Sequence, residues 1–207
     1  MTCFDNGLVH RARTPNVTID IADIITKWSR PGSTFASEHM VAQTGRASNG
    51  AISWCASAES LTAPTLPPWY DGFEQFLEPG IRDLCLFFIH ECGWITYTSC
   101  EGHEGIGAPS SLRHVGILPR DSQEYFEVNE FLDAVVNSFR ISFHGASDIS
   151  LGVLRHRLND PTRGCDVLDI EFAPLTGQKT YFSGIDEATA WLMPILREEF
   201  SRKAGMS

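Results

Sequence analysis

Apolar residues recur three or four positions apart in three stretches of this chain, which is the spacing of one helix face. The first stretch spans 81–92 and ends at Gly93, where a left-handed helix cap belongs. The second spans 128–139 and follows Asp121 and Glu124, which have the spacing of a capping box. The third spans 186–200 and contains Pro194, which we expect to kink or locally break it. The pattern predicts three amphipathic helices.

Four shorter runs are rich in β-branched, aromatic or alternating apolar residues, which indicates strands. They span 94–100, 114–118, 150–157 and 166–172. The last two flank the turn signal at 159–164, so we expect them to form a hairpin. The order α-β-β-α-β-β-α predicts an α+β fold, a two-layer sandwich of a mainly antiparallel sheet with helices on one face.

The first third of the chain has a different character. Residues 1–68 are rich in small, polar and turn-forming residues, and 62–68 is typical of an extended connector. Only residues 21–28 have a helical pattern there. We therefore expect an irregular N-terminal arm or lid with one short helix at 1–68, with a mobile tail as the alternative. The α+β core domain is expected at 69–207.

Composition narrows the class of partner. The chain of 207 residues has 26 acidic and 16 basic residues and a formal charge of −10, so its surface should repel polyphosphates, and nucleic acid is a disfavoured partner.

The longest apolar run of the chain, 84–89, is far shorter than the roughly 20 residues that cross a membrane as a helix. The six cysteines lack close regular spacing, and no export signal is evident, so we expect reduced thiols and a cytoplasmic location.

One segment carries candidate chemistry. Cys100, Glu101, Gly102 and His103 follow a predicted strand, and His114 begins the next. If these strands pair as a hairpin, Cys100, His103 and His114 meet at one end of the sheet. Thiolate and imidazole suit Zn²⁺, so a zinc site formed by these three residues is one interpretation. A single Cys-x-x-His pair is a weak zinc motif, and Cys92 could be a fourth ligand only if the preceding helix end folds back.

Covalent chemistry is a second interpretation of the same segment. A thiol beside an imidazole can ionise and attack an electrophilic carbon. Cys100 would be the nucleophile, His103 or His114 the base, and Glu101 the residue that orients the base. Adjacency in the sequence does not establish that geometry, because neighbouring residues around a strand end can point to opposite faces of a sheet.

Two further interpretations need neither a metal nor a covalent step. The glycine-rich backbone from Glu101 to Gly107 could form an anion-binding nest, with positive charge from His103, Arg113 and His114. That run lacks the Lys-Ser/Thr ending of a phosphate-binding P-loop. In a purely structural interpretation, the glycines make a flexible hairpin loop and Cys100 is a small buried hydrophobe.

Charged residues on the last two predicted strands form another candidate. Asp169 and Glu171 lie two apart and therefore share one face, opposite the apolar face. Two such carboxylates could hold a hard cation, although the solvated side of a half-buried strand is their more common place. The basic run 155–157 could meet a phosphate or these carboxylates, and cross-strand salt bridges are its favoured use.

The sequence therefore leaves two classes of function open. The favoured one is a small-molecule enzyme or ligand-binding domain, zinc-dependent in one version, with Cys100, Glu101 and His103 as catalytic residues. Gly102, Arg113 and His114 would bind the ligand. The alternative is a non-enzymatic acidic interaction protein, of immunity or adaptor type, that binds a basic protein partner. No nucleotide fingerprint or nucleophile elbow identifies a substrate.

Overall fold

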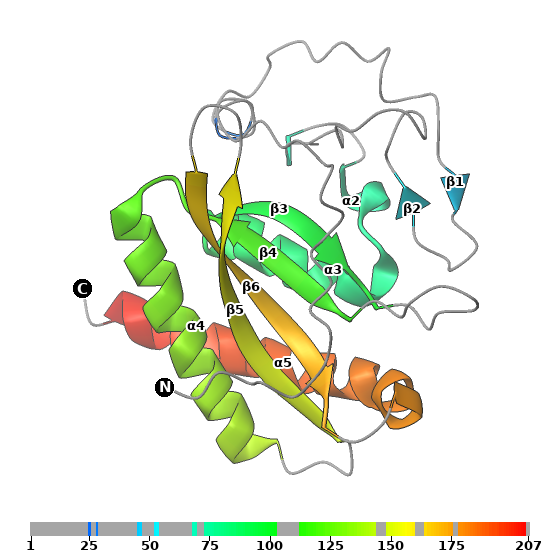
Figure 1. Cartoon of the computed structure of the whole chain (residues 1–207). Helices are drawn as coiled ribbons and strands as arrows, with labels where there is room; N and C mark the ends of the chain where they lie inside the picture. Colours follow the sequence, from blue (N-terminus) through cyan, green and yellow to red (C-terminus); the bar gives the residue numbers. More distant parts are fainter. Residues whose placement is uncertain are drawn as a thin grey trace.

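A computed structural model of the chain describes residues 25, 28, 45–46, 52–53, 68–69, 73–102, 112–143, 148–159, 164–175 and 178–205. Its centre is an antiparallel sheet of four strands in the order β3-β4-β6-β5 (Figure 1). The strands are β3 (Ile95–Cys100), β4 (His114–Leu118), β5 (Ile149–Asn159) and β6 (Gly164–Pro174). β3–β4 and β5–β6 pair as predicted, and β4 and β6 join the two pairs.

Three long helical segments accompany the sheet. They are α3 (Pro79–Leu86), which η2 (Phe87–Glu91) continues as a π-helix, α4 (Ser122–Ser142) and α5 (Gln178–Gly205), and a short α2 spans Phe73–Phe76. The α+β class and the predicted order of elements are thus confirmed. The helices extend beyond their predicted cores, most of all α5, which begins at Gln178 and continues through Pro194 without a break.

Local sequence explains where the helices begin and end. The Asp121 side chain accepts a hydrogen bond from the Glu124 amide at 2.9 Å, which caps α4 as its sequence predicts. Gly93 has a φ of 71°, and this left-handed conformation, which glycine adopts without strain, ends the segment formed by α3 and η2.

The strand register divides the side chains of the sheet between two faces. One face, here called the helix face, carries Val115, Leu168 and Phe172, and the Phe172 ring meets Phe139 of α4 with centroids 6.1 Å apart. The opposite face, here called the open face, carries the residues of the alternate register, which include His114 and Gly116. The helices cover the helix face, as predicted.

Burial of apolar side chains on the helix face forms the main core. Its sheet layer packs against α4 and α5, and an aromatic cluster fills the end near η2. The Trp94 ring stacks on Phe88 with centroids 5.8 Å apart and meets Phe131 edge-on at 5.3 Å. Removing these large side chains from water supplies the main driving force for this arrangement.

Little of the predicted N-terminal arm lies within the described residues. Ile25 and Trp28 are helical, which agrees with the short helix expected there, and Trp28 packs edge-on against Phe73 at 6.5 Å. The paired two-residue strands β1 (Gly45–Arg46) and β2 (Ile52–Ser53) also belong to this region. The remainder of 1–68, and therefore the prediction of an arm or lid, falls outside the described residues.

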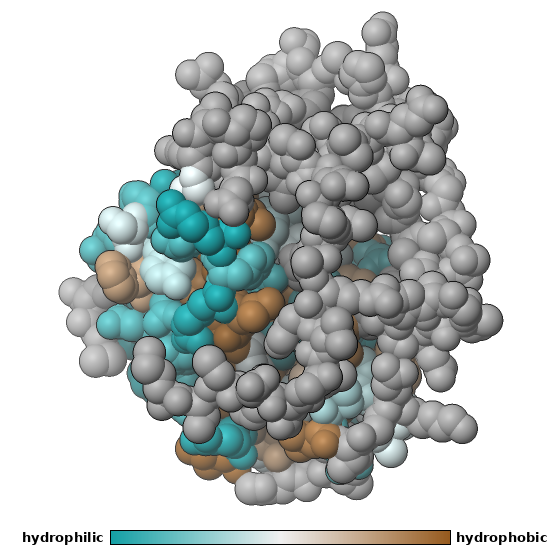
Figure 2. Space-filling model, viewed as in Figure 1, coloured by the Kyte–Doolittle hydropathy of each residue, from teal (hydrophilic) through white to brown (hydrophobic). Residues whose placement is uncertain are grey.

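The open face is mixed in character. Figure 2 shows hydrophilic and hydrophobic residues side by side on the described part of the surface in this view. One interpretation from the sequence is wrong here. Asp169 was expected on the solvated side of a half-buried strand, but it is wholly buried, because Tyr97, Gly116 and His156 on the other three strands surround its carboxylate.

Candidate functional site

The predicted site is divided between the two faces of the sheet. Cys100 pairs with His114 across β3 and β4 on the open face. Glu101 and Arg113, each one residue away, bond instead to the N-terminal end of α3 and to Asp186 of α5 on the helix face. His103 falls outside the described residues. The predicted site residues that the structure describes therefore lie at one end of the sheet, but on both of its faces.

A row of three functional side chains crosses the open face at this end of the sheet. Cys100 is the register partner of His114, and His114 is the register partner of Glu171 on β6. Directly paired residues of antiparallel strands have Cβ atoms about 5 Å apart, so the three side chains leave the sheet next to one another. We call Cys100, His114 and Glu171 the thiol row.

The hydrogen bonds of the thiol row favour a reactive thiol. His114 Nδ1 lies 2.9 Å from the carbonyl oxygen of Leu112, and because a carbonyl only accepts, Nδ1 carries the proton of the neutral ring. The lone pair is then on Nε2, the nitrogen that can act as a base. The Gly102 amide donates to Cys100 Sγ at 3.4 Å, a contact that strengthens when the sulfur becomes a thiolate. Gly102 has a φ of 88°, a conformation that favours glycine.

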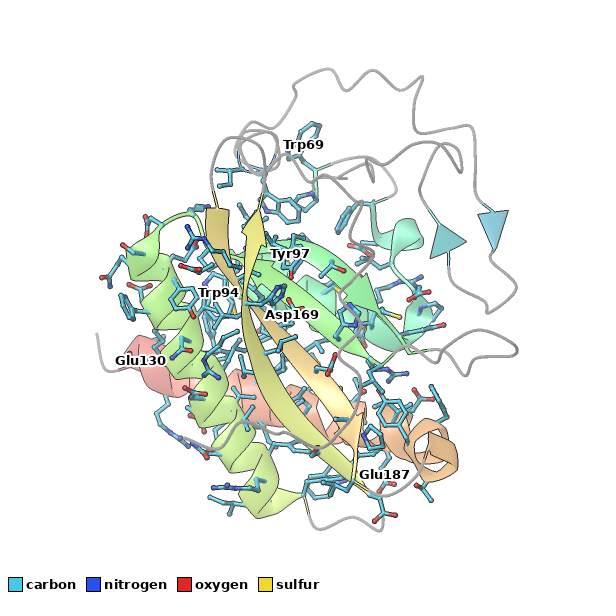
Figure 3. The ribbon with its side chains drawn as sticks, viewed as in Figure 1. Trp69, Trp94, Tyr97, Glu130, Asp169 and Glu187 are labelled. Carbon is cyan, nitrogen blue, oxygen red and sulfur yellow. The ribbon has the colours of Figure 1, made fainter. Side chains whose placement is uncertain are left out.

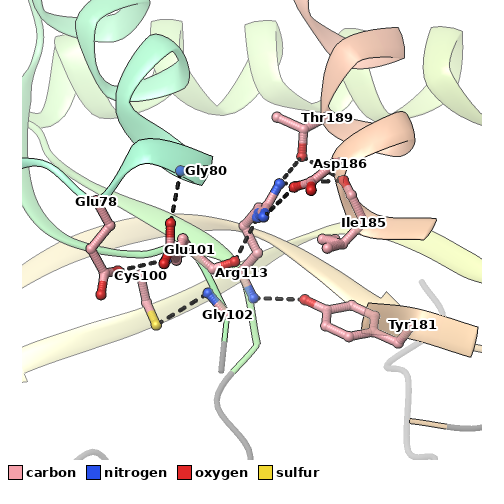
Figure 4. A network of polar contacts seen from close by, with 10 residues as sticks. All are labelled: Glu78, Gly80, Cys100, Glu101, Gly102, Arg113, Tyr181, Ile185, Asp186 and Thr189. Atoms are coloured by element: carbon pink, nitrogen blue, oxygen red, sulfur yellow. Dashed lines mark hydrogen bonds and ion pairs between the residues drawn. The ribbon is translucent and has the colours of Figure 1, made fainter. Parts of the chain in front are cut away.

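Arg113 joins the strand ends to α5. Its side chain is buried at 4% exposure and donates from Nε to the Glu101 carbonyl at 2.6 Å, from Nη1 to Thr189 Oγ1 at 2.7 Å and from Nη2 to Asp186 Oδ1 at 2.8 Å (Figure 4). These bonds join the residue that follows β3, the residue that precedes β4, and α5. We call this set the arginine latch.

Glu101 extends the latch to α3. Its Oε2 accepts a hydrogen bond from the Gly80 amide at 2.8 Å, so the carboxylate caps the N-terminus of that helix, where the backbone dipoles favour negative charge. A Cβ at Gly80 would lie 2.6 Å from Arg113 Nη2 and 3.0 Å from Glu101 Oε2, which explains the glycine. We therefore interpret Glu101 as a positioning residue. Its predicted role of orienting a base lacks support from these contacts.

A shallow hollow of about 180 Å³ lies beside the latch, and its lining includes Gly80, Arg113, Asp186 and Met193. The predicted ligand-binding role of Arg113 would be exercised here. The guanidinium already donates to four protein acceptors, however, among them the Ile185 carbonyl at 3.3 Å. An anion would have to compete with these bonds, so that role stays a prediction.

Tyr181 of α5 supports the same junction. Its hydroxyl oxygen accepts the Arg113 backbone N–H at 2.7 Å. Burial raises the pKa of the Tyr181 hydroxyl, the bond from Arg113 lowers it, and negative charge on Glu171 and Cys100 raises it further. Tyr181 is thus a neutral anchor near neutral pH, and two members of the thiol row lie close enough to influence it.

Other cysteines provide a contrast with Cys100. Burial raises the pKa of the Cys85 thiol to about 12. Burial, with the neighbouring charge of Glu91, likewise raises the pKa of Cys92 to about 12. Both thiols therefore stay protonated and unreactive near neutral pH. Cys92 lies before β3 and Cys100 at its end, and the six residues of this strand separate the two thiols by more than about 10 Å, too far for Cys92 to be a fourth ligand of a metal at Cys100.

Within the described residues, no group of three or more His, Cys, Asp or Glu side chains is placed to hold a metal ion. Neither the thiol row nor the Asp169–Glu171 pair is therefore placed as a metal site. The predicted zinc site of Cys100, His103 and His114 includes one residue outside the described part, so zinc binding stays a prediction.

A second polar cluster on the open face was not predicted as a site. The Tyr97 hydroxyl donates to Asp169 Oδ1 at 2.6 Å, and His156 Nε2 lies 3.0 Å from the Tyr97 oxygen and 3.2 Å from Asp169 Oδ2. Figure 3 labels Tyr97 and Asp169 over the middle of the sheet. The Arg157–Asp166 pair at 2.9 Å is a cross-strand salt bridge of the kind expected for the basic run at 155–157, whereas Arg155 pairs with Asp133 of α4.

Two signals in the sequence could have led to these residues. Glu171 and Asp169 were recognised as sharing a face, but only the β4–β6 register joins that face to Cys100. Gly116 in the middle of a buried strand was the other signal, since an interior strand glycine often marks a close approach. A Cβ there would lie 2.5 Å from Tyr97 Cε1 and 2.5 Å from Asp169 Oδ1.

Among the parts of the chain that the structure describes, no helix is long and apolar enough to cross a membrane. Comparison of the chain with protein-family models, with curated proteins and with solved structures gave no match.

Proposed function

We propose that the chain is a small-molecule enzyme that uses the Cys100 thiol as a nucleophile toward an acyl compound. The observation that supports this most directly is the strand register, which sets Cys100, His114 and Glu171 side by side on the open face. A thiol next to a base that is itself near a carboxylate is the arrangement of nucleophilic catalysis by cysteine.

Each member of the thiol row has a distinct role in this proposal. Nε2 of His114 takes the proton of Cys100, and the thiolate attacks the carbonyl carbon of the substrate. The leaving group departs with the proton from the imidazolium, which leaves a thioester on Cys100 that water hydrolyses. Glu171 stabilises the positive charge that the imidazole gains between these steps.

Backbone geometry complements the side chains. The Gly102 amide, which donates to Cys100 Sγ at 3.4 Å, favours the anionic sulfur and helps to hold it at the strand end. The arginine latch fixes Glu101, the residue after Cys100, and Arg113, the residue before His114. The latch therefore positions the thiol row without taking part in the chemistry, and it accounts for the contacts of half-buried Glu101 and buried Arg113.

Reaction with p-nitrophenyl acetate tests this function without knowledge of the natural substrate. We expect one equivalent of p-nitrophenolate to be released in a burst, with a single acetyl group located on the Cys100 peptide by mass spectrometry. Cys100→Ser should abolish the burst. His114→Gln should slow acetylation at least about tenfold, because it removes the base.

Cys165 offers a matched control, because it is also half-buried but its register partner is Leu158. Cys165→Ser should leave the burst unchanged. Acetylation confined to lysines or to other cysteines, or a burst that survives in Cys100→Ser, would contradict the proposal. The acidic interaction protein predicted as the alternative would then be the better account.

A further inference from the structure

The polar cluster of Tyr97, Asp169 and His156 spans the whole width of the sheet. Tyr97 lies at a register irregularity of β3 between Thr96 and Thr98. Its side chain passes over Gly116 of β4, where a Cβ would lie 2.5 Å from the Tyr97 ring, and reaches Asp169 on β6 and His156 on β5. A bulge and a glycine thus make room for a contact among strands that are not all neighbours.

The Asp169 carboxylate is the centre of this cluster. Asp169 is 0% exposed, and burial of a carboxylate is costly unless hydrogen bonds or a positive charge compensate it. Its two oxygens meet different groups, Oδ1 the hydroxyl of Tyr97 at 2.6 Å and Oδ2 the imidazole of His156 at 3.2 Å. A buried carboxylate in contact with a histidine is the arrangement that orients an imidazole and stabilises its protonated form.

The hydrogen-bond directions determine the tautomer of His156. The Tyr97 hydroxyl donates its one proton to Asp169 Oδ1, so the Tyr97 oxygen and Asp169 Oδ2 both present lone pairs to His156 Nε2. Nε2 must therefore carry a proton, and the lone pair of the neutral ring is on Nδ1. Among the described residues Nδ1 has no hydrogen-bond partner, and the His156 side chain is 28% exposed.

We propose that His156 is a general base on the open face, oriented by Asp169 and Tyr97, and that it acts on the hydroxyl group of a small molecule. Nδ1 accepts the hydroxyl proton while Nε2–H stays bonded to Asp169 and Tyr97. The ring becomes an imidazolium whose positive charge faces the buried carboxylate, and the ligand keeps the electron pair as an alkoxide or phenoxide. Return of the proton restores the neutral ring.

This site is separate from the thiol row. Gly152 of β5 is the register partner of Glu171 in the thiol row. His156 lies four residues further along β5, so roughly 13 Å of strand separates it from Gly152. The inference therefore does not rest on the reactivity of Cys100, and either proposal can fail without the other.

The tautomer is tested directly by nitrogen-15 NMR of the uniformly labelled full chain. Two-bond correlations distinguish a protonated ring nitrogen from one that carries a lone pair. We expect the neutral His156 ring to have its proton on Nε2 and its lone pair on Nδ1. A lone pair on Nε2 would overturn the proposal, and this measurement needs no variant that must fold.

Diethyl pyrocarbonate tests the activation of His156, because it acylates unprotonated imidazole nitrogen. Peptide mass spectrometry measures the rate at which His156 is modified. His90, exposed near the end of η2, is the internal reference in the same sample. In Asp169→Asn we expect the His156 rate to fall about fivefold relative to His90, because the orienting carboxylate is lost. An unchanged ratio in a folded Asp169→Asn variant would show that Asp169 does not activate His156 and would overturn the proposal.

Discussion

Replacing Gly116 with alanine will destabilise the protein by about 2–3 kcal/mol, because the position has no room for a methyl group. The added Cβ would lie 2.5 Å from Tyr97 Cε1, 2.5 Å from Asp169 Oδ1 and closer still to Thr98 Cγ2. None of these atoms is the end of a long flexible side chain, so the Tyr97 ring must move. That movement breaks the 2.6 Å bond to Asp169 and leaves a buried carboxylate short of a donor. Urea unfolding followed by circular dichroism measures the loss.

Gly152→Ala is the matched control for Gly116→Ala. Gly152 is a strand glycine on the same face of the sheet, and a Cβ there meets nothing within 4 Å. We expect its free energy of unfolding to change by less than about 0.5 kcal/mol, or to rise, since alanine restricts the unfolded chain more than glycine does. Equal losses in the two variants would mean that the effect belongs to strand glycines in general and not to the Tyr97–Asp169 contact.

Arg113→Met should cost about 3 kcal/mol of stability, the second large effect that we expect. Methionine keeps much of the volume of the side chain but removes all its donors. The carbonyls of Glu101 and Ile185 lose the bonds at 2.6 and 3.3 Å, and the α3 cap loses the positive charge beside Glu101. Asp186 loses less, because its side chain is 85% exposed and water can replace the guanidinium.

Arg157→Met removes an arginine of the same kind from the surface. Arg157 pairs with Asp166 at 2.9 Å, and both side chains are more than half exposed, with values of 56% and 57%. Such pairs contribute less than about 1 kcal/mol. If Arg113→Met unfolds at the same urea concentration as Arg157→Met, the arginine latch does not hold the strand ends together.

The helices and strands were predictable because each depends on a local pattern. The periods of apolar residues predicted the core of α3, α4 and α5, and the β4 boundaries agree with the sequence pattern at both ends. The Asp121 cap is an interaction between residues three apart, and the chain around it carries all the information needed. Element ends were less predictable, as the extra two turns at the start of α5 show.

The candidate site was only partly predictable, because its partners are far apart in the sequence. Cys100 and His114 could be paired from a hairpin, but Glu171 joins them through a register between β4 and β6 that no local pattern specifies. Asp169 had the alternation of a solvated residue, yet Tyr97 reaches it across an intervening strand. Arg113 resembled a ligand-binding residue by charge alone, and its partners on α5 are more than 70 positions away.

If Cys100 is activated by its place beside His114, as we propose, site-resolved alkylation of the native protein will show it. Iodoacetamide at pH 7, with quantification of each cysteine peptide, should modify Cys100 first, while Cys85 and Cys92, whose pKa values burial raises to about 12, stay unmodified. His114→Gln should slow the modification of Cys100 about tenfold and leave Cys165 unchanged. A Cys100 that reacts no faster than Cys165, or at the same rate without His114, would rule out activation of this thiol by His114.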